Sequence, residues 1–333
     1  MFEVRFYRKQ VFFYESSLLL QPPCYNAGKR RDVMIAETAF LHYDAFADEP
    51  GKGNPGGVVL QAEALTDEQM LDLAARVGFN ETCFVLPSER ADFRIRYFTP
   101  GHEMDLCGHG TMACLAALAA AGRLDGLDTL TVETLAGVLP IRVERDAGSG
   151  RPSFVMRQAA PQFRPFGGSR AELADAIGLA EQDLHPDLPI VYGSTGIWTL
   201  CVPVRGLAAC ARMRPDNRRF PELLAELPRA SLHPFCLETV HADARLHARH
   251  FSSPYSGTVE DPVTGTASGV LGAYWDRCIA AAPPEGLRLT VEQGREVGRD
   301  GKVHVRVVPR GGEREVEIRG SAVFVREWSL PAL

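Results

Sequence analysis

The chain has 333 residues, of which 45% are hydrophobic and 23% are charged, proportions typical of an ordinary globular protein. Its formal net charge is −6, and it has no run of lysines and arginines long enough to follow a phosphate backbone, which argues against nucleic acid as a partner. No apolar run approaches the roughly 18–20 residues that a membrane helix needs. The length suits two domains or one large one.

Residues 1–33 differ from everything that follows them. They lack clean hydrophobic periodicity, and the apolar run within residues 16–20 is too short for the core of a secretion signal. A strand-like alternation begins just after Met34. We therefore expect the functional protein to start at Met34, and residues 1–33 to be a non-native or disordered extension.

Short segments in which apolar and polar residues alternate dominate the chain after Met34, and each is bounded by turn residues. This pattern predicts β-strands. The segments are 38–46, 57–61, 83–87, 93–98, 129–134 and 138–145, followed by 153–159, 189–193, 197–204, 246–251, 287–291, 302–308 and 315–320.

Helices are fewer, and they are of two kinds. Thr66 can cap a helix over 67–78, Ser169 can cap one over 170–178, and a weaker pattern covers 219–227. Two further helices, over 110–122 and about 266–281, are rich in Ala, Gly, Leu and Val nearly all round. Such helices are buried rather than amphipathic.

The two apolar helices belong to an internal repeat. Residues 96–118 and 249–275 share a strand end, a loop that contains proline, a turn of small residues and then the helix. This repeat predicts an α+β fold of two pseudo-symmetric domains, 34–150 and 151–318, each a sheet wrapped around one helix. Strand 319–330 could complete the first sheet. The starts of the two helices would then face each other across a cleft.

Each helix start carries groups that can bind or transfer protons. Gly108 and Gly110 leave the first-turn amides before the 110–122 helix accessible to an anion such as a substrate carboxylate, and His109 would point to the same place. Cys107 is either a thiol activated by the helix start or a plain buried cysteine. At the second start, Thr264 and Thr266 offer hydroxyl groups to a carboxylate or oxyanion.

Three carboxylates stand near these turns. Glu81 enters an apolar strand, where it is either a solvated strand-end group or a general acid/base. Glu260 and Asp261 precede the second helix; one could cap it, and the other could act as an acid/base facing His109. The stretch 53-GNPGG-57 has the composition of a turn.

Other classes of site find little support in the sequence. The eight cysteines are scattered and form no CxxC pair, which predicts buried thiols in a reducing compartment and a cytoplasmic protein. His102, Cys107 and His109 lie on an irregular loop without a fourth ligand, so we expect no metal. The motifs GxGxxG, GxxxxGK[ST], HExxH and GxSxG are missing where they would carry function.

Taken together, a series of motifs resembles the phenazine-biosynthesis (PhzF-like) isomerase family, a branch of the diaminopimelate epimerase-like superfamily. Each motif is weak alone, but their order along the chain is specific, and the likeness runs from Met34 to the C-terminus. The motifs are 44-DAF-46, 53-GNPGGVV-59, 80-NETCFV-85, 98-FTPGHEMDLCGHGTMA-113, 194-STG-196 with 200-LCVPV-204, 260-EDPVTGTA-267, 292-EQGREVGRDGKVHV-305 and 319-RGSAVFV-325.

The resemblance implies curved, mostly antiparallel sheets around the two helices, a homodimer, and an active site between the domains that transfers protons without a cofactor. By resemblance the catalytic residues are Glu81, His109 and Asp261. The residues expected to bind a small carboxylate metabolite are Asn54, Cys107, Gly108, Gly110, Thr264, Gly265 and Thr266.

Three departures from related patterns refine this expectation. Thr266 stands where the family commonly has serine, and Gly110 replaces a usual alanine, which would leave the helix start open. Racemases of the superfamily use two facing cysteines, but the repeat sets Thr264 opposite Cys107. We therefore expect an isomerase with Glu81 as the proton shuttle. The alternatives are a racemase or epimerase that uses Cys107, and a catalytically silent metabolite-binding dimer.

Overall fold

The computed structural model describes residues 37–146, 148 and 150–331. The predicted extension over residues 1–33 lies outside these described residues. Within them, seventeen strands are linked by hydrogen bonds into one network of pairings. The described part of the chain contains no helix with the length and apolar character required to cross a membrane.

The strands account for most of the regular structure. They are β1 (Glu37–Ala45), β2 (Asn54–Val59), β3 (Thr82–Leu86), β4 (Phe93–Phe98), β5 (Glu103–Met104), β6 (Thr129–Thr134), β7 (Gly137–Arg145), β8 (Pro152–Arg157), β9 (Gln162–Pro165), β10 (Val191–Ser194), β11 (Trp198–Pro203), β12 (Ser231–Cys236), β13 (Leu246–Ala248), β14 (Leu287–Gln293), β15 (Gly301–Arg310), β16 (Glu313–Gly320) and β17 (Ala322–Pro331).

Six α-helices lie among the described residues, and three of them begin next to a residue whose side chain caps the helix. They are α1 (Asp67–Val77), α2 (Gly108–Ala120), α3 (Arg170–Ala176), α4 (Leu207–Arg212), α5 (Phe220–Leu223) and α6 (Gly265–Tyr274), the last continued by a π-helical turn over Trp275–Ile279. The predicted caps are present: the Thr66 hydroxyl accepts from the Gln69 amide, and the Ser169 hydroxyl accepts from the Glu172 amide.

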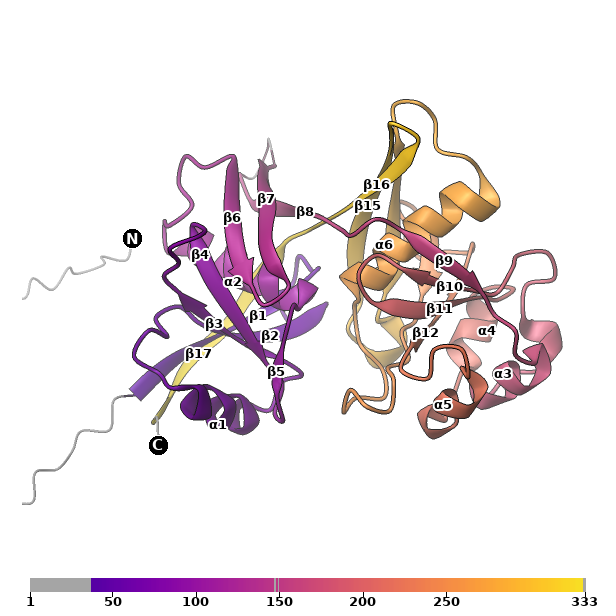
Figure 1. The fold of residues 1–333 in the computed structure, drawn as a ribbon, viewed down its shortest axis with the longest axis horizontal. Helices are drawn as coiled ribbons and strands as arrows, with labels where there is room; N and C mark the ends of the chain where they lie inside the picture. Colours follow the sequence, from indigo (N-terminus) through magenta and orange to yellow (C-terminus); the bar gives the residue numbers. More distant parts are fainter. Residues whose placement is uncertain (1–36, 147, 149, 332–333) are drawn as a thin grey trace, which may run out of the picture. The chain divides into compact units, whose positions relative to one another are not determined.

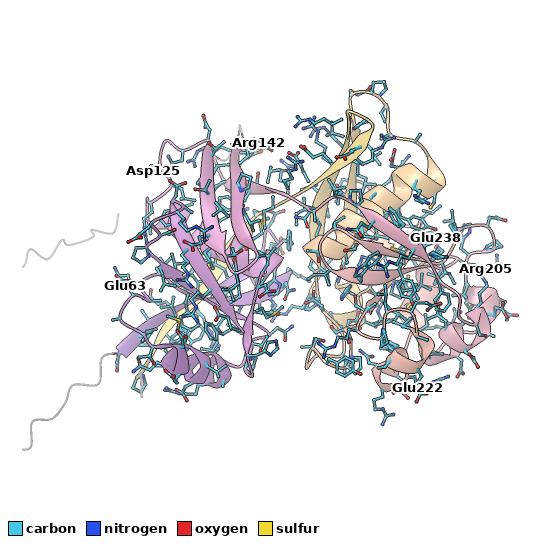
Figure 2. The ribbon with its side chains drawn as sticks, in the orientation of Figure 1. Glu63, Asp125, Arg142, Arg205, Glu222 and Glu238 are labelled. Atoms are coloured by element: carbon cyan, nitrogen blue, oxygen red, sulfur yellow. The ribbon has the colours of Figure 1, made fainter. Side chains whose placement is uncertain are left out.

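Helices α2 and α6 are buried almost completely, as their uniform apolar composition predicts. Helix α2 packs against β1, β2, β3, β4, β8 and β17, and α6 packs against β10, β14, β15 and β16 (Figure 1). Each helix therefore has its own surrounding set of strands, while charged side chains such as Glu63 and Asp125 stay exposed on the outside (Figure 2).

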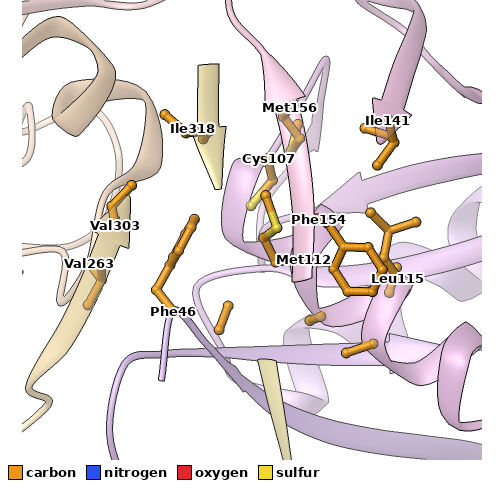
Figure 3. Close-up of a cluster of buried hydrophobic side chains, with 14 of the residues drawn as sticks. Phe46, Cys107, Met112, Leu115, Ile141, Phe154, Met156, Val263, Val303 and Ile318 are labelled. Atoms are coloured by element: carbon orange, nitrogen blue, oxygen red, sulfur yellow. The ribbon is translucent and has the colours of Figure 1, made fainter. Parts of the chain in front are cut away.

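Two strand pairings join early and late parts of the chain. Strand β8 pairs antiparallel with β16, and the last strand, β17, pairs antiparallel with the first, β1 (Figure 1). Phe46, just after β1, belongs to the same apolar cluster as Val263 and Val303 (Figure 3). These contacts hold the surroundings of α2 next to those of α6. The domain boundary near residue 150 stays a prediction.

The structure corrects several details of the secondary structure. Of the stretch 53–57, only Gly53, with φ +63°, belongs to a turn, and β2 begins at Asn54. Gly56 lies so close to α2 that a Cβ there would be 3.3 Å from the Ala113 Cβ. The predicted 219–227 helix is reduced to α5, which directly follows a 3-10 turn over Asn217–Arg219. Strands β5, β9 and β12 and helix α4 were not predicted.

Candidate active site

Glu81 and His109 lie side by side at the beginning of α2. Glu81 immediately precedes β3, and its carbonyl accepts a hydrogen bond from the Gly57 amide of β2. His109 is the second residue of α2, and its Nε2 is 3.0 Å from Oε2 of Glu81. The side chain of His109 is only 9% exposed and that of Glu81 only 14%, so they form a largely buried ion pair.

The same Glu81 oxygen is buried, and His109 is the charged group beside it. Although Oε2 is close enough to His109 for an ion pair, it accepts no well-aligned hydrogen bond from the described residues. Buried polar atoms without a partner are rare in folded proteins, and each calls for a reason. An acceptor kept available for a substrate proton would be such a reason.

Asn54 connects this pair to the start of α6. Its Nδ2 lies 3.2 Å from Nδ1 of His109, donates to Oδ1 of Asp261 over 2.7 Å, and donates to the Val263 carbonyl over 2.9 Å. The Asn54 side chain is fully buried at the first residue of β2. The structure thus places Glu81, His109, Asn54 and Asp261 in one continuous row of polar side chains.

Asp261 is held by residues on its far side as well. The Thr264 hydroxyl donates to Asp261 Oδ2 over 2.5 Å, and Gln293 Nε2 donates to the Asp261 carbonyl over 2.8 Å. Gln293 Oε1 also accepts from the Thr264 amide over 3.2 Å. Sequence reasoning did not single out Gln293, although it lies within the 292–305 motif that contributed to the family resemblance.

The structure gives different partners to the neighbouring carboxylates Glu260 and Asp261, whose roles the sequence left open. Glu260 forms a two-point ion pair with Arg249, from Nε to Oε1 over 2.9 Å and from Nη2 to Oε2 over 2.6 Å. Both of these side chains are largely buried. Asp261 instead faces Asn54 and Thr264. Glu260 is therefore occupied by a structural pair, and Asp261 is the carboxylate that joins the site.

Electrostatics assign different protonation behaviour to the groups at the site. Burial raises the pKa of the Cys107 thiol to about 12, so this sulfur is neutral at pH 7. Burial opposes the charged form of His109, but the neighbouring carboxylate of Glu81 holds the pKa of His109 well above its usual range. Because Cys107 is a neutral thiol, Glu81 is the partner that keeps the imidazolium charged. Burial also raises the pKa of Asp261.

The starts of α2 and α6 present backbone amides that no described hydrogen bond uses. At α2 these are the amides of Gly108 and His109, because the Gly110 amide donates to the Cys107 sulfur over 3.3 Å. At α6 they include the amides of Gly265 and Thr266, because the side chain of the N-cap residue, Thr264, makes no capping hydrogen bond. Two such helix starts form a setting suited to an anion.

Gly110 does not serve the purpose expected from the sequence. Its amide is already bonded to Cys107, and a Cβ at this position would lie 2.5 Å from the Cys83 sulfur. The glycine therefore makes room for Cys83 beneath the helix rather than opening the helix start to a ligand. Gly108, by contrast, has no heavy atom within 4 Å of a Cβ position.

One group of metal-type donors coincides with the site. An oxygen of Glu81, the sulfur of Cys107 and a ring nitrogen of His109 all lie within 4.8 Å of one another. His102 bonds to Thr99 instead and is not part of this group. The absence of a metal stays a prediction, and it calls for a direct measurement.

Comparisons with known proteins agree with the family motifs. The model of the phenazine biosynthesis-like PhzC-PhzF family matches residues 43–328. An isomerase of Bacillus subtilis, YfhB, named as uncharacterized, is 53% identical over 87% of this chain and 97% of its own. The trans-2,3-dihydro-3-hydroxyanthranilate isomerase of Pseudomonas aeruginosa is 32% identical over 86% of this chain and 97% of its own.

Solved structures show the same fold. A PhzF-family protein of Bacillus anthracis is 51% identical, with a TM-score of 0.86 over 89% of this chain and 99% of its own. A hydroxyproline epimerase of Agrobacterium vitis, only 12% identical, has a TM-score of 0.54 over 88% of this chain and 92% of its own. The predicted α+β, epimerase-like fold class is confirmed. The chain belongs to the phenazine biosynthesis-like PhzC-PhzF family.

Proposed function

We propose that this protein moves a proton between two carbons of a small carboxylate-bearing metabolite without a cofactor. Its family membership makes it an isomerase; the reaction and the residue roles are the proposal. The observation that carries it is the buried row formed by Glu81, His109, Asn54 and Asp261. Acid/base groups held this close, away from water, are suited to proton transfer.

Glu81 is the proposed proton shuttle. Its Oε2 accepts no well-aligned hydrogen bond from the described residues and lies 3.0 Å from Nε2 of His109. Glu81 would take a proton from one carbon and return it to another. His109 would donate toward the electron-rich part of the substrate, and Asp261, whose pKa is raised by burial, would supply or orient a second proton.

The substrate carboxylate would bind between the two helix starts. The amides around Gly108 and Gly265 are the available donors, and the hydroxyl of Thr266, the second residue of α6, would join them. Each helix also contributes the positive end of its dipole. The proposal includes the homodimer that is usual in the family, which sedimentation in solution would test.

The first experiment screens carboxylate metabolites for thermal stabilisation and then follows the binding compounds by NMR in heavy water. Trans-2,3-dihydro-3-hydroxyanthranilate is the first candidate, because it is named as the substrate of the Pseudomonas aeruginosa relative. We expect deuterium to enter the substrate at a carbon. Treatment with a chelator should leave the rate unchanged; a loss restored by added metal would instead assign Glu81, Cys107 and His109 to a metal site.

Two substitutions separate this mechanism from racemisation. Glu81→Gln should lower the exchange rate by about 10²–10⁴-fold while ligand binding persists, since an amide cannot accept the proton. Cys107→Ser should leave exchange largely intact, because the serine oxygen can still accept from the Gly110 amide. A racemase dependent on Cys107 would give the opposite result, and a silent binding protein would give no exchange in any variant.

A further inference from the structure

A charged sheet face lies apart from the candidate active site. Strands β7, β8, β16, β15 and β14 pair in that order. Alternate residues, such as Ile141, Ile318 and Val305, are buried in the core, so their neighbours in each strand occupy the opposite face. A cavity of about 600 Å³ lies on this opposite face, and Glu81, His109 and Asp261 do not line it.

Arginines dominate the lining of this cavity. Its charged side chains are the five arginines Arg142, Arg245, Arg288, Arg306 and Arg319 and the three carboxylates Glu144, Asp243 and Glu317. The local excess of positive charge is opposite in sign to the net charge of −6 on the whole chain. Such a local reversal needs either a structural or a ligand-binding explanation.

The three carboxylates do not neutralise the arginines. Glu317 is shared between Arg142, at 3.0 Å, and Arg306, at 3.6 Å. Glu144 is 3.2 Å from Arg142 and 3.6 Å from Arg319. Asp243 is paired with a lysine, Lys302, at 2.8 Å. Structural ion pairs therefore use every carboxylate of the lining and still leave guanidinium charge without a counterpart.

Two of the arginines directly oppose each other. Arg288 of β14 and Arg306 of β15 are register partners on the same face, and like charges at such positions destabilise a sheet. No described carboxylate lies within ion-pair distance of Arg288, and the buried Nε of Arg306 has no acceptor among the described residues. A bound anion would offset the repulsion between Arg288 and Arg306 and would also give the Arg306 Nε an acceptor.

The nearby aromatic and titratable groups fit the same explanation. The guanidinium of Arg245 lies 5.3 Å from the ring centre of Trp275, which holds it at the cavity wall without neutralising it. Burial, together with the charge of Arg319, lowers the pKa of His304, so its ring adds no charge at neutral pH. Arg142, which lines the cavity, is labelled near the top of β7 in Figure 2.

We propose that this cavity binds a multivalent oxyanion, a phosphate group or a polycarboxylate, between the guanidinium groups of Arg288 and Arg306. The planar fork of a guanidinium matches two oxygens of either group. The site does not depend on the proposed isomerase reaction. The anion would bind on the sheet face formed by β7, β8, β16, β15 and β14.

The test measures thermal unfolding of the full chain in chloride, orthophosphate and citrate at one ionic strength. The matched variants are Arg288→Gln, in the cavity, and Arg310→Gln, an exposed arginine of β15 outside it that pairs with Glu315. Wild type and Arg310→Gln should be stabilised by orthophosphate, citrate or both, relative to chloride. Calorimetric titration should show that Arg288→Gln binds the stabilising anion at least about tenfold more weakly than wild type does.

A second signature separates a binding site from a merely structural arginine. In chloride, Arg288→Gln should unfold at the same temperature as wild type or higher, because it removes the repulsion with Arg306. A response to orthophosphate alone assigns the site to phosphate, and a response to both probes assigns it to oxyanions in general. Equal responses in the two variants, or no response beyond chloride in wild type, overturn the proposal.

Discussion

Asn54 and Asp261 are 207 positions apart in the chain, yet the Asn54 amide nitrogen donates to Oδ1 of Asp261 over 2.7 Å. The same nitrogen is 3.2 Å from Nδ1 of His109. The two protons of this NH₂ group go to Asp261 Oδ1 and, over 2.9 Å, to the Val263 carbonyl, so Asn54 lies against Nδ1 of His109 without donating to it. One asparagine thus joins the start of α6 to His109, whose Nε2 faces Glu81.

Replacing Asn54 should therefore affect stability and catalysis together. Asn54→Ala leaves Asp261 Oδ1 and the Val263 carbonyl without their buried donor, and we expect the free energy of unfolding to fall by about 1–3 kcal/mol. Urea denaturation would measure this change, and NMR of the His109 ring nitrogens would report the altered surroundings of Nδ1. Unaltered ring signals would contradict the role given to Asn54.

The contrast between Gly110 and Gly108 gives a second prediction. Gly110→Ala drives a Cβ to within 2.5 Å of the Cys83 sulfur, so it should destabilise the fold by about 1–3 kcal/mol although alanine favours helices. Gly108→Ala meets no atom within 4 Å and should change stability by less than about 0.5 kcal/mol. Thermal unfolding checks both. Cys83→Ala should restore stability to Gly110→Ala; failure of this rescue would disprove the proposed clash.

Glu260 and Asp261 are adjacent, but their substitution should have opposite consequences. Glu260→Gln breaks the buried pair with Arg249 and should cost about 3–5 kcal/mol of stability. Asp261→Asn removes a carboxylate whose charged form burial disfavours, so stability should hold or rise while proton transfer is lost. Denaturation curves and heavy-water exchange measure the two effects separately. Similar losses of stability in both variants would contradict this division.

His247 should make the fold sensitive to alkaline pH. Burial opposes its charge, but hydrogen bonds to Glu292 and Glu296 raise the pKa of His247 to about 9, above the value of 6.5 that is ordinary for histidine in an unfolded chain. The stability gained, about 3 kcal/mol, is fully present below pH 6.5 and is lost as the pH rises from 6.5 through about 9. Urea denaturation at several pH values should show this loss in wild type. An equally steep loss in His247→Gln would assign it to other groups.

The sequence predicts most of the local structure because apolar residues recur in most elements at the spacing typical of a strand or a helix. Alternation indicated β4 and β7, and the capping residue Thr66 indicated α1. Strand β12 carries no such pattern, since all six of its residues, including a proline, are buried. Without alternation, a strand buried on both faces is hard to distinguish from other apolar segments.

The candidate site was only partly accessible from the sequence. His109 and Asp261 stand at helix starts that the internal repeat reveals, and Glu81 followed from the family motifs. The bridging role of Asn54 and the support from Gln293 depend on contacts between residues far apart in the chain. No local periodicity encodes such contacts, so they became visible only once the strands were placed.

The pairing of β17 with β1 has a consequence for synthesis. Residues Glu37–Ala45 leave the ribosome long before Ala322–Pro331 do, so one edge of β1 remains without its partner while nearly all of the chain is translated. Unpaired strand edges invite association with other chains. A ribosome that stalls before residue 322 thus releases a product whose first-formed sheet is open, exposed and prone to aggregate.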